Sequence, residues 1–248
     1  MAAQSNSETE TRDTILNGSI TLIQPRHGYR FSVDAILLGR FARAKARDRV
    51  LELGAGCGVV SIMIASLYRP REVVALEIQP TLAAMVERNA AINGLQSVRS
   101  LCADLRSKSI RGLAPASFDL VVANPPYRAA ATGRESPDHG RRLARSESVG
   151  TLQDFVVAAR RYVRRSGRVA FVFAARRSAE LISSMRANKL EPKRVRFVHP
   201  QIGMPASVIL VEARAGGGIE AAIEPPLVLY ESPGIYTAEA RAILTSSE

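Results

Sequence analysis

The central part of the chain alternates between short apolar runs and stretches with helical spacing of apolar residues. The apolar runs predict strands, namely Arg49–Leu53, Val73–Glu77, Val98–Cys102, Phe118–Ala123, Arg168–Phe173, Val195–His199 and Val208–Glu212. The spaced stretches predict helices, namely Val59–Tyr68, Thr81–Asn93, Leu152–Arg164 and Ser178–Ala187. Runs of about five apolar residues that are separated by helices are typical of parallel strands buried on both faces. The pattern therefore predicts an α/β fold with a doubly wound sheet and helices on both faces.

The connection between the last two predicted strands is much shorter than the others. It consists of residues 200–206, Pro-Gln-Ile-Gly-Met-Pro-Ala, and has no helical pattern. A parallel crossover needs about a dozen residues or more, whereas a tight loop can join an antiparallel pair. We therefore expect a seven-stranded, mostly parallel sheet whose last strand is antiparallel.

The segment before this pattern divides into two parts. Residues 1–14 are polar and are predicted to be a disordered tail, and residues 15–45 form an N-terminal segment before the α/β domain of residues 46–215. Within the N-terminal segment, Ser32 or Asp34 is well placed to cap an amphipathic helix. One α/β domain with modest additions suits a chain of 248 residues.

Residues 216–248 are predicted to be a linker and a C-terminal extension. The segment begins with Gly216-Gly-Gly, which is typical of a flexible linker. It continues with a short strand candidate at Leu227–Tyr230 and ends in a helix from Thr237 onward. It is therefore expected to be an addition to the α/β domain and not a second domain.

The composition limits the class of protein. Apolar residues make up 46% of the chain, which is enough for a substantial core. No apolar run approaches the ~20 residues of a membrane span, and the polar N-terminus lacks the apolar stretch of a secretion signal. The two cysteines, Cys57 and Cys102, show no metal-ligand spacing. These features favour a cytoplasmic protein without a metal site.

The charge of the chain points to its partner. The net charge is +11, and arginine supplies most of it, because lysine occurs only at positions 45, 108, 189 and 193. The planar guanidinium group matches phosphate better than the point charge of lysine does. A strongly positive chain favours a polyanionic partner, although abundant arginine can also reflect the general composition of the organism's proteins.

A glycine-rich turn follows the first predicted strand. Residues 51–58 read Leu-Glu-Leu-Gly-Ala-Gly-Cys-Gly, with glycines at Gly54, Gly56 and Gly58 that allow a tight turn and a close approach to a ligand. The spacing differs from the Gly-x-Gly-x-x-Gly that seats a pyrophosphate on a helix N-terminus. Glu52 precedes the glycines, where it would repel a diphosphate but tolerate a sulfonium-bearing amino acid. The turn alone is a weak signal, since nucleotide binding is its usual interpretation.

Acidic residues end the next two strands. Glu77 ends the second strand and can accept hydrogen bonds from both ribose hydroxyls of an adenosine. Asp104 follows the third strand and can accept from the adenine amino group. Each could instead be a solvated acid at a strand end. Together with the glycine turn, however, they outline a pocket for S-adenosylmethionine.

The fourth strand leads into Asn124-Pro125-Pro126-Tyr127, the most specific feature of the chain. Consecutive prolines stop a strand and fix the backbone rigidly. An amino group conjugated with a ring is a poor nucleophile, because its lone pair is delocalised. The Asn124 side-chain oxygen and the Pro125 carbonyl can each accept one N–H, so that the lone pair turns toward the methyl carbon. Tyr127 would stack on the substrate plane, and catalysis would be mainly positioning.

These residues give the chain a resemblance to a known family. It resembles the amino-methyltransferases of the Asn-Pro-Pro-Tyr type, and among them most closely the bacterial tRNA(Val) adenine methyltransferase family. Residues 24–38 are similar to that family's opening block, and residues 224–237 are similar to its C-terminal tail. The resemblance covers nearly the whole chain. It implies a Rossmann-like class I methyltransferase fold, S-adenosyl-L-methionine as cofactor, and methylation of an exocyclic adenine nitrogen in RNA, namely tRNA.

The resemblance also implies roles for individual residues. The expected cofactor contacts are Phe31, Asp34, Glu52, Gly54, Gly56, Gly58, Glu77, Asp104 and Asn124, with the segment of residues 15–45 covering the cofactor. The expected catalytic residues are Asn124, Pro125, Pro126 and Tyr127. The chain departs from the family at Ser146, where relatives are expected to carry histidine, and this departure puts the exact substrate in doubt. We expect a monomer or a weak dimer.

A basic, Gly/Ser/Pro-containing loop follows Tyr127 and is predicted to bind RNA phosphates beside the pocket. Its arginines are Arg128, Arg134, Arg141, Arg142 and Arg145. Four further arginines, at positions 160, 161, 164 and 165, lie on a predicted helix, where a solvated face is the simpler explanation.

Three alternatives use some of the same features. A glutamine-methylating enzyme that acts on a release factor would use the same Asn-Pro-Pro-Tyr, but such enzymes usually carry a helical domain before the glycine turn. A DNA adenine methyltransferase would need more protein for base flipping than residues 127–167 provide. A non-catalytic RNA-binding module would explain the charge but would leave the motifs as coincidences.

Overall fold

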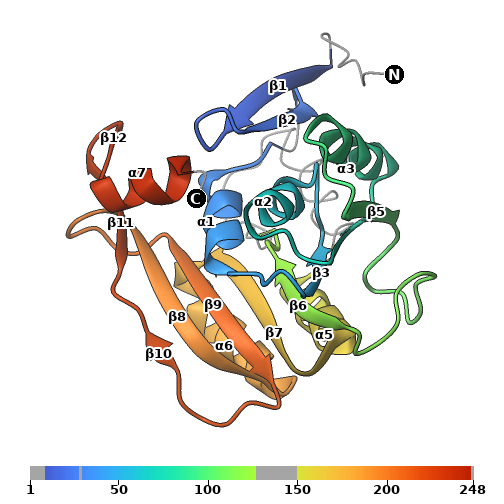
Figure 1. Ribbon diagram of the computed structural model, residues 1–248. Helices are drawn as coiled ribbons and strands as arrows, with labels where there is room; N and C mark the ends of the chain where they lie inside the picture. The colour runs from blue at the N-terminus through green and yellow to red at the C-terminus, as the bar shows by residue number, and fades with distance from the viewer. Residues whose placement is uncertain (1–8, 28–29, 127–149, 247–248) are drawn as a thin grey trace, which may run out of the picture.

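The computed structural model describes residues 9–27, 30–126 and 150–246. Its central sheet has ten strands within this part of the chain, in the order β12-β11-β8-β9-β7-β6-β3-β4-β5, with β10 paired to β8 (Figure 1). The seven strands of the α/β unit are β3 (Arg49–Leu53), β4 (Glu72–Glu77), β5 (Val98–Cys102), β6 (Phe118–Ala123), β7 (Val163–Ala174), β8 (Leu190–Gln201) and β9 (Val208–Ala215).

The direction of the strands confirms the predicted α/β fold. Strand β3 is parallel to β4 and β6, and the parallel pairing continues to β5 on one side and β7 on the other. Strand β9, the last of the seven, lies between β7 and β8 and is antiparallel to both. The carboxyl ends of β3, β4, β5 and β6 therefore meet at one edge of the sheet, where ligands bind in such folds.

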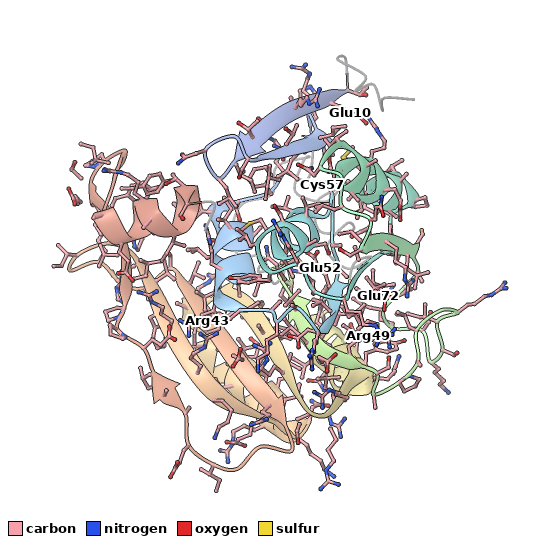
Figure 2. All side chains as sticks on the ribbon, viewed as in Figure 1. Glu10, Arg43, Arg49, Glu52, Cys57 and Glu72 are labelled. Atoms are coloured by element: carbon pink, nitrogen blue, oxygen red, sulfur yellow. The ribbon has the colours of Figure 1, made fainter. Side chains whose placement is uncertain are left out.

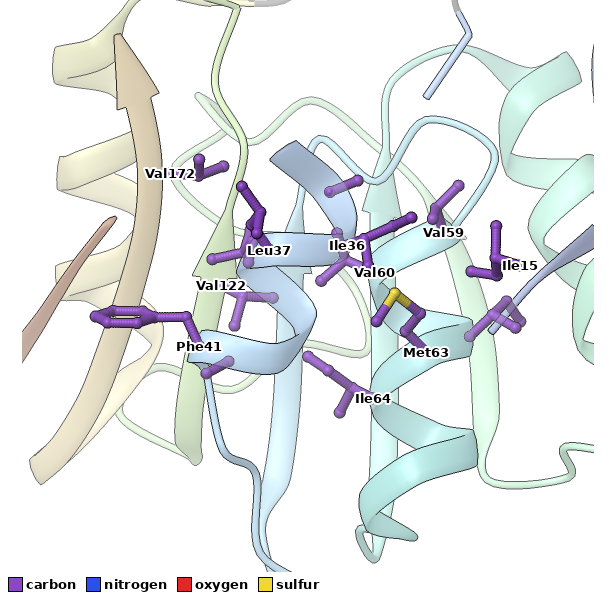
Figure 3. Packing of buried hydrophobic residues seen from close by; sticks show 14 of the residues in the cluster. Ile15, Ile36, Leu37, Phe41, Val59, Val60, Met63, Ile64, Val122 and Val172 are labelled. Carbon is purple, nitrogen blue, oxygen red and sulfur yellow. The ribbon is translucent and has the colours of Figure 1, made fainter. Parts of the chain in front are cut away.

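Helices cover both faces of the sheet because successive strand residues point to opposite sides. Helices α1 (Val33–Phe41), α2 (Val59–Tyr68) and α3 (Pro80–Ile92) lie on one face, and α5 (Leu152–Tyr162) and α6 (Ser178–Ala187) lie on the other (Figure 1). In the first layer, Leu37 of α1 points toward Val122 and Val172 on the sheet, and Ile36 lies beside Val60 of α2 (Figure 3). Helix α1 is thus part of the core.

The N-terminal residues form a hairpin that the sequence pattern did not predict. Strand β1 (Glu10–Ile15) pairs antiparallel with β2 (Ile20–Pro25). The prediction of a disordered tail is therefore wrong for residues 10–14. These residues are polar because most of β1 is only partly buried, and a two-stranded sheet can leave one strand largely in water without apolar alternation. Ser32 occupies the N-cap position of α1 as predicted, but its side chain makes no capping hydrogen bond.

The C-terminal extension joins the central sheet. Strand β11 (Leu227–Ser232) is parallel to β8, and the short strands β10 (Ala222–Ile223) and β12 (Ile235–Tyr236) pair with β8 and β11. Helix α7 (Ala238–Thr245) follows, capped by the Thr237 hydroxyl, which accepts from the Ala240 amide at 3.1 Å. The sheet of the described residues is accordingly larger than the seven strands that were predicted.

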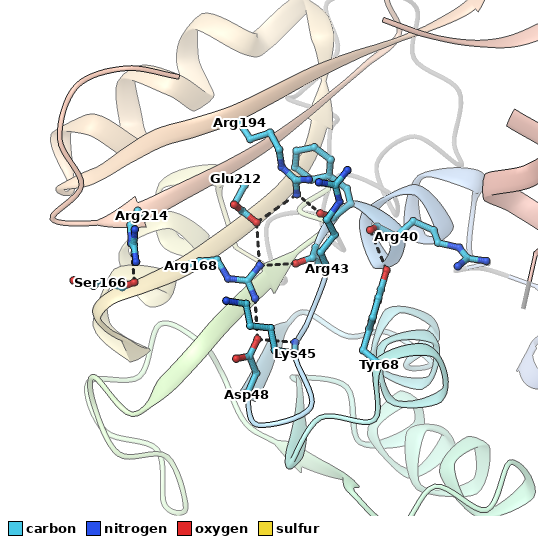
Figure 4. A network of polar contacts seen from close by, with 12 residues as sticks. Arg40, Arg43, Lys45, Asp48, Tyr68, Ser166, Arg168, Arg194, Glu212 and Arg214 are labelled. Carbon is cyan, nitrogen blue, oxygen red and sulfur yellow. Dashed lines mark hydrogen bonds and ion pairs between the residues drawn. The ribbon is translucent and has the colours of Figure 1, made fainter. Parts of the chain in front are cut away.

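A network of buried and half-buried ion pairs joins Asp48, which precedes β3, to strands β7, β8 and β9 (Figure 4). Arg168 pairs with Asp48 at 2.8 Å and with Glu212 at 3.2 Å, and Arg194 pairs with Glu212 at 3.4 Å. Glu212 therefore stands between two guanidinium groups whose side chains are only 20% and 12% exposed. It neutralises charge that the surrounding protein shields from water.

The same two arginines complete the C-terminus of α1. Arg168 donates to the Ala42 carbonyl at 3.0 Å, and Arg194 donates to the carbonyl of Phe41, whose ring lies 4.0 Å from the guanidinium carbon. The last carbonyls of a helix lack partners within the helix and carry partial negative charge. Positive side chains at this point thus fix the end of α1.

Replacing Glu212 by alanine is expected to lower the free energy of unfolding by about 2 kcal/mol, because two partly buried arginines lose their shared partner and each keeps one other carboxylate, Asp48 or Glu224. Glu180→Ala provides the control, since Glu180 pairs with Arg177 at 2.6 Å but is 51% exposed. We expect that control to lose about 1 kcal/mol or less. Urea unfolding followed by circular dichroism measures both values, and equal losses would show that the network contributes no more than a surface pair.

Candidate active site

The glycine turn between β3 and α2 lies at the carboxyl edge of the sheet. All three glycines adopt positive φ, with values of 67° at Gly54, 58° at Gly56 and 86° at Gly58. The amides of Gly54 and Ala55 donate to the Leu76 carbonyl at 2.9 and 3.0 Å, which ties the turn to the end of β4. A residue with a side chain rarely adopts this backbone conformation.

Neighbouring side chains also leave no room at two of these positions. A Cβ atom on Gly54 would lie 2.9 Å from the Phe155 ring of α5, and a Cβ atom on Gly58 would lie 3.0 Å from Val86 of α3. Helices on opposite faces of the sheet therefore both pack against the turn. Gly54 and Gly58 are therefore required both by the backbone conformation and by the lack of space for a side chain.

Glu77 connects the end of β4 to the glycine turn. One carboxylate oxygen accepts from the Gly56 amide at 2.8 Å, and the other accepts from the Gln79 amide at 2.9 Å. The residue is buried, with 3% of its surface exposed. The oxygen near Gln79 also accepts from the Gln79 side-chain amide, at 3.5 Å. The oxygen bonded to Gly56 can accept a further hydrogen bond, from a ligand hydroxyl.

Glu52 has a different role from the one predicted for it. It is buried, and Figure 2 labels its position. One carboxyl oxygen accepts from the Ser61 amide at 2.8 Å and from the Ser61 hydroxyl at 2.5 Å. Burial raises its pKa to about 8, against the opposing effect of these hydrogen bonds. The group therefore keeps its proton at neutral pH and cannot repel a diphosphate. Its hydrogen bonds to Ser61 hold the first turn of α2.

The raised pKa of Glu52 gives the stability of the protein a specific pH dependence. The unfolded chain loses this proton near the ordinary pKa of 4.5, whereas the folded protein keeps it up to about pH 8. Between these values the unfolded state binds fewer protons, so that stability falls as pH rises, by about 1.4 kcal/mol per pH unit. Glu52→Gln removes this slope, and we expect the variant to become progressively more stable than the wild type from about pH 5.5 to about pH 7.5.

Glu72→Gln is the matched control for this measurement. Burial disfavours the charged form of Glu72, but hydrogen bonds from Arg99 and Arg49 outweigh that effect and hold its pKa below the ordinary value. This carboxylate is therefore charged in both states over the whole range. The difference in unfolding free energy between Glu72→Gln and the wild type should stay constant. A constant difference for Glu52→Gln as well would contradict the assignment of Glu52.

Asp104 contributes to a small pocket across three strand ends. The pocket is lined by Gly54, Leu76, Ile78, Ala103, Asp104 and Leu105, which come from the ends of β3, β4 and β5. The guanidinium group of Arg106 donates to both Asp104 oxygens, at 3.0 and 2.7 Å. These hydrogen bonds lower the pKa of Asp104. A charged carboxylate thus stands at the edge of a pocket formed by the glycine turn.

Asn124 leaves the sheet next to the glycine turn. Ala123, the last residue of β6, is paired with Leu53, the last residue of β3, so that Asn124 and Gly54 follow neighbouring strand ends. Asn124 is half-buried, Pro125 is buried and Pro126 is exposed. The predicted amino-group site and the predicted cofactor turn are therefore adjacent, although 70 positions separate them along the chain.

The comparison with known families agrees with this geometry. A family model described as the methyltransferase small domain matches residues 33–189, which is more than half of the chain. The chain belongs to this family. The match includes the glycine turn, Glu77, Asp104 and Asn124 of this methyltransferase.

Several proteins that are similar to this chain share one described activity. The methyltransferase is 28% identical over 192 residues to the tRNA1(Val) (adenine(37)-N6)-methyltransferase of Parabacteroides distasonis, covering 75% of this chain and 77% of the relative. It is 26% identical over 214 residues to the protein of that name from Aeromonas hydrophila, covering 86% and 87%.

Solved structures support the fold of the methyltransferase. A protein from Agrobacterium tumefaciens described as a predicted O-methyltransferase superposes with a TM-score of 0.67 at 22% identity, covering 85% of this chain and 94% of that one. M. jannaschii TYW2, solved in complex with AdoMet, superposes with a TM-score of 0.59 at 18% identity, covering 85% and 88%. These similarities confirm the Rossmann-like class I fold.

Two predicted cofactor contacts of the methyltransferase lie where β2 leads into α1. The Phe31 amide donates to the Gln24 side-chain oxygen at 3.2 Å, and the Phe31 ring packs against the core. Asp34 lies in the first turn of α1 and is half-buried. Their contact with a cofactor stays a prediction.

The remaining predicted site residues lie outside the described residues. They are Tyr127 and the loop arginines Arg128, Arg134, Arg141, Arg142 and Arg145, together with Ser146. In the part of the chain that the structure covers, no group of three or more His, Cys, Asp or Glu is arranged to hold a metal ion. No helix in that part is long and apolar enough to cross a membrane.

Sequence reasoning missed one residue that shapes the site. Asn89 of α3 is fully buried and donates to the Cys57 carbonyl inside the glycine turn at 2.8 Å. Its signal in the sequence is its place on the apolar face of the helix, where Leu82, Met85 and Val86 also lie. A polar residue on such a face needs buried hydrogen-bond partners.

Proposed function

We propose that this methyltransferase transfers the methyl group of S-adenosylmethionine to the exocyclic amino nitrogen of an adenine in RNA, and that its substrate is a tRNA. The observation that carries the proposal is the position of Asn124 at the end of β6, next to the glycine turn at the end of β3. In the proposed arrangement, the amide oxygen of Asn124 would lie beside the methyl group that the cofactor presents.

The pocket residues fit the proposed cofactor. Gly54 lines the pocket, and without a side chain the glycine turn allows a ligand to approach the backbone. Glu77 has accepting capacity for ribose hydroxyls, and Asp104 lies on the pocket edge for the adenine amino group. The cofactor would supply an electrophilic methyl group. Phe31 and Asp34 would cover its methionine end.

The residues after β6 would prepare the acceptor. The Asn124 side-chain oxygen and the Pro125 carbonyl would each accept one N–H of the amino group, which withdraws its lone pair from the ring and aims it at the methyl carbon. Tyr127 would stack on the base. No strong base is needed, because the proton leaves with or after transfer. The enzyme would act by orientation in a site that excludes water.

The proposal of tRNA as substrate has two supports. Relatives at 26–28% identity are named tRNA1(Val) (adenine(37)-N6)-methyltransferases, and the net charge of +11 suits a polyanion. The five arginines proposed to bind phosphates belong to residues 128–145. If the substrate is a tRNA, we also propose that the enzyme acts in the cytoplasm.

The test is transfer of radiolabelled methyl from S-adenosylmethionine to two acceptors in parallel, total tRNA without modifications and a purified release factor. The proposal predicts label in tRNA. Label only in the release factor would replace it with glutamine methylation. Label in neither acceptor, with the cofactor still bound, would refute the RNA substrate and direct the search to small molecules. Absence of cofactor binding would refute the proposed enzymatic activity and would favour a non-catalytic RNA-binding module.

A further inference from the structure

Two asparagines, Asn89 of α3 and Asn93 at its C-cap, hold the edge of strand β2. The Asn93 side chain accepts from the Thr21 amide at 3.0 Å and donates to the Thr21 carbonyl at 2.7 Å. The Asn89 side chain accepts from the Ile23 amide at 2.7 Å and donates to the Ile23 carbonyl at 2.9 Å. Each amide group thus pairs with both backbone groups of one strand residue.

The spacing of the two asparagines explains why each can pair with one residue of β2. Four helix residues rise by about 6 Å, and two strand residues span about 6.8 Å. Asn89 and Asn93 are four residues apart, and Thr21 and Ile23 are two residues apart. Helix α3 therefore presents side-chain amides at nearly the repeat of a neighbouring strand, on the edge of β2 that β1 does not occupy. Figure 1 shows α3 beside the hairpin.

Asn89 makes one contact that Asn93 lacks. Its amide nitrogen also donates to the Cys57 carbonyl at 2.8 Å, between Gly56 and Gly58 of the cofactor turn. The second donor of Asn93 instead goes to the Asn89 carbonyl within the helix, at 2.7 Å. A single buried amide group therefore joins the N-terminal hairpin to the glycine turn.

The hairpin in turn positions the segment that leads into α1. Gln24 of β2 is buried; its side chain donates to Asp13 of β1 at 2.7 Å and accepts from the Phe31 amide at 3.2 Å. A chain of hydrogen bonds thus runs from the glycine turn through Asn89 and β2 to Phe31. Both ends of this chain belong to the proposed cofactor site.

We propose that Asn89 is a positioning residue that couples the N-terminal hairpin to the cofactor turn. Cofactor binding then stabilises the hairpin, and an ordered hairpin strengthens cofactor binding by the same factor, because coupling between two sites is reciprocal. The inference rests on the proposed function, since it assumes that the glycine turn binds the cofactor. A purely structural asparagine would lower stability without linking the two parts.

The test compares Asn89→Ala with Asn93→Ala, two truncations one helical turn apart that each remove a pair of contacts to β2. S-adenosylhomocysteine binding is measured by calorimetry, and hydrogen exchange is followed in peptides that cover Glu10–Ile15, which neither asparagine contacts. We expect Asn89→Ala to weaken binding by about tenfold and Asn93→Ala by less than about threefold. The ligand should slow exchange of β1 in the wild type and in Asn93→Ala, but not in Asn89→Ala.

Each contrary outcome has a distinct meaning. Equal losses of affinity in the two variants, or unchanged exchange of β1 when the wild type binds the ligand, would overturn the coupling and leave the proposed function intact. No binding to the wild type would overturn both. The exchange measurement on the wild type needs no variant, so that unchanged exchange of β1 overturns the proposal even if Asn89→Ala does not fold. In that case Asn89→Asp, which keeps the size and one accepting oxygen of the side chain, replaces it in the comparison with Asn93→Ala.

Discussion

Asn124→Ala is expected to slow methyl transfer by about a hundredfold to a thousandfold, the loss typical when one positioned polar group is removed from an active site. The affinity for S-adenosylhomocysteine should change by less than about threefold, because Asn124 is proposed to act on the acceptor nitrogen during transfer. An interaction made mainly in the transition state affects turnover and not ground-state binding of the cofactor.

The measurement is single-turnover transfer to unmodified tRNA, together with calorimetry of S-adenosylhomocysteine binding. Asn124 is half-buried at the end of β6, so thermal unfolding serves as the control for the fold. A parallel loss of transfer and cofactor affinity would mean that Asn124 serves the cofactor or the turn. Unchanged transfer would remove it from the mechanism.

Gly54→Ala is expected to weaken S-adenosylhomocysteine binding by about tenfold or more, which corresponds to about 1.4 kcal/mol. The new methyl group would lie 2.9 Å from the ring of Phe155, which is fully buried and cannot move aside freely. The turn must shift instead. Because its amides bond to Leu76 at the edge of the pocket, a shift of the turn changes the pocket itself.

Gly94→Ala is the control for the backbone effect. Gly94 has the same φ of 67°, but a Cβ atom there would meet nothing within 4 Å. Both substitutions should destabilise the fold by about 1–2 kcal/mol through the positive φ alone. Only Gly54→Ala should lose cofactor affinity. An equal loss in Gly94→Ala would show that general destabilisation, and not the shape of the turn, lowers binding.

The apolar pattern predicted the buried elements well. Strands β3, β5 and β6 and helices α2 and α6 have the predicted bounds. Strand β7 begins at Val163, inside the segment that was predicted to be helical to residue 164. Residues 164–166 of this strand are exposed, and two of them are arginines, so that they carry no alternation of apolar residues. The pattern is informative only where a strand is buried.

The same reason explains the two ends of the chain. Strand β1 is polar because it forms the outer strand of a small hairpin. Strand β11 was predicted, but its pairing with β8 could not be, because the choice of a neighbour depends on contacts between distant segments. The local pattern of apolar residues indicates that a strand exists, but it does not indicate with which strand it pairs.

The site was predictable to the extent that it lies at strand ends. The glycine turn, Glu77 and Asn124 follow directly from strands with clear apolar patterns. Glu52 was misinterpreted because its position in the sequence does not reveal that its carboxyl group is buried against Ser61. Asn89 was missed because its partner Ile23 lies 66 residues away. Its function depends on the approach of a helix to a hairpin that the sequence pattern did not show.

Analysis of the modified nucleoside tests the central claim most directly. Unmodified total tRNA is incubated with S-adenosylmethionine and the wild-type enzyme or Asn124→Ala, digested to nucleosides, and examined by mass spectrometry. We predict adenosine methylated on its exocyclic nitrogen with the wild type and almost none with the variant. Methylation of another nucleoside, or no methylation of RNA by an enzyme that binds the cofactor, would contradict the proposed reaction.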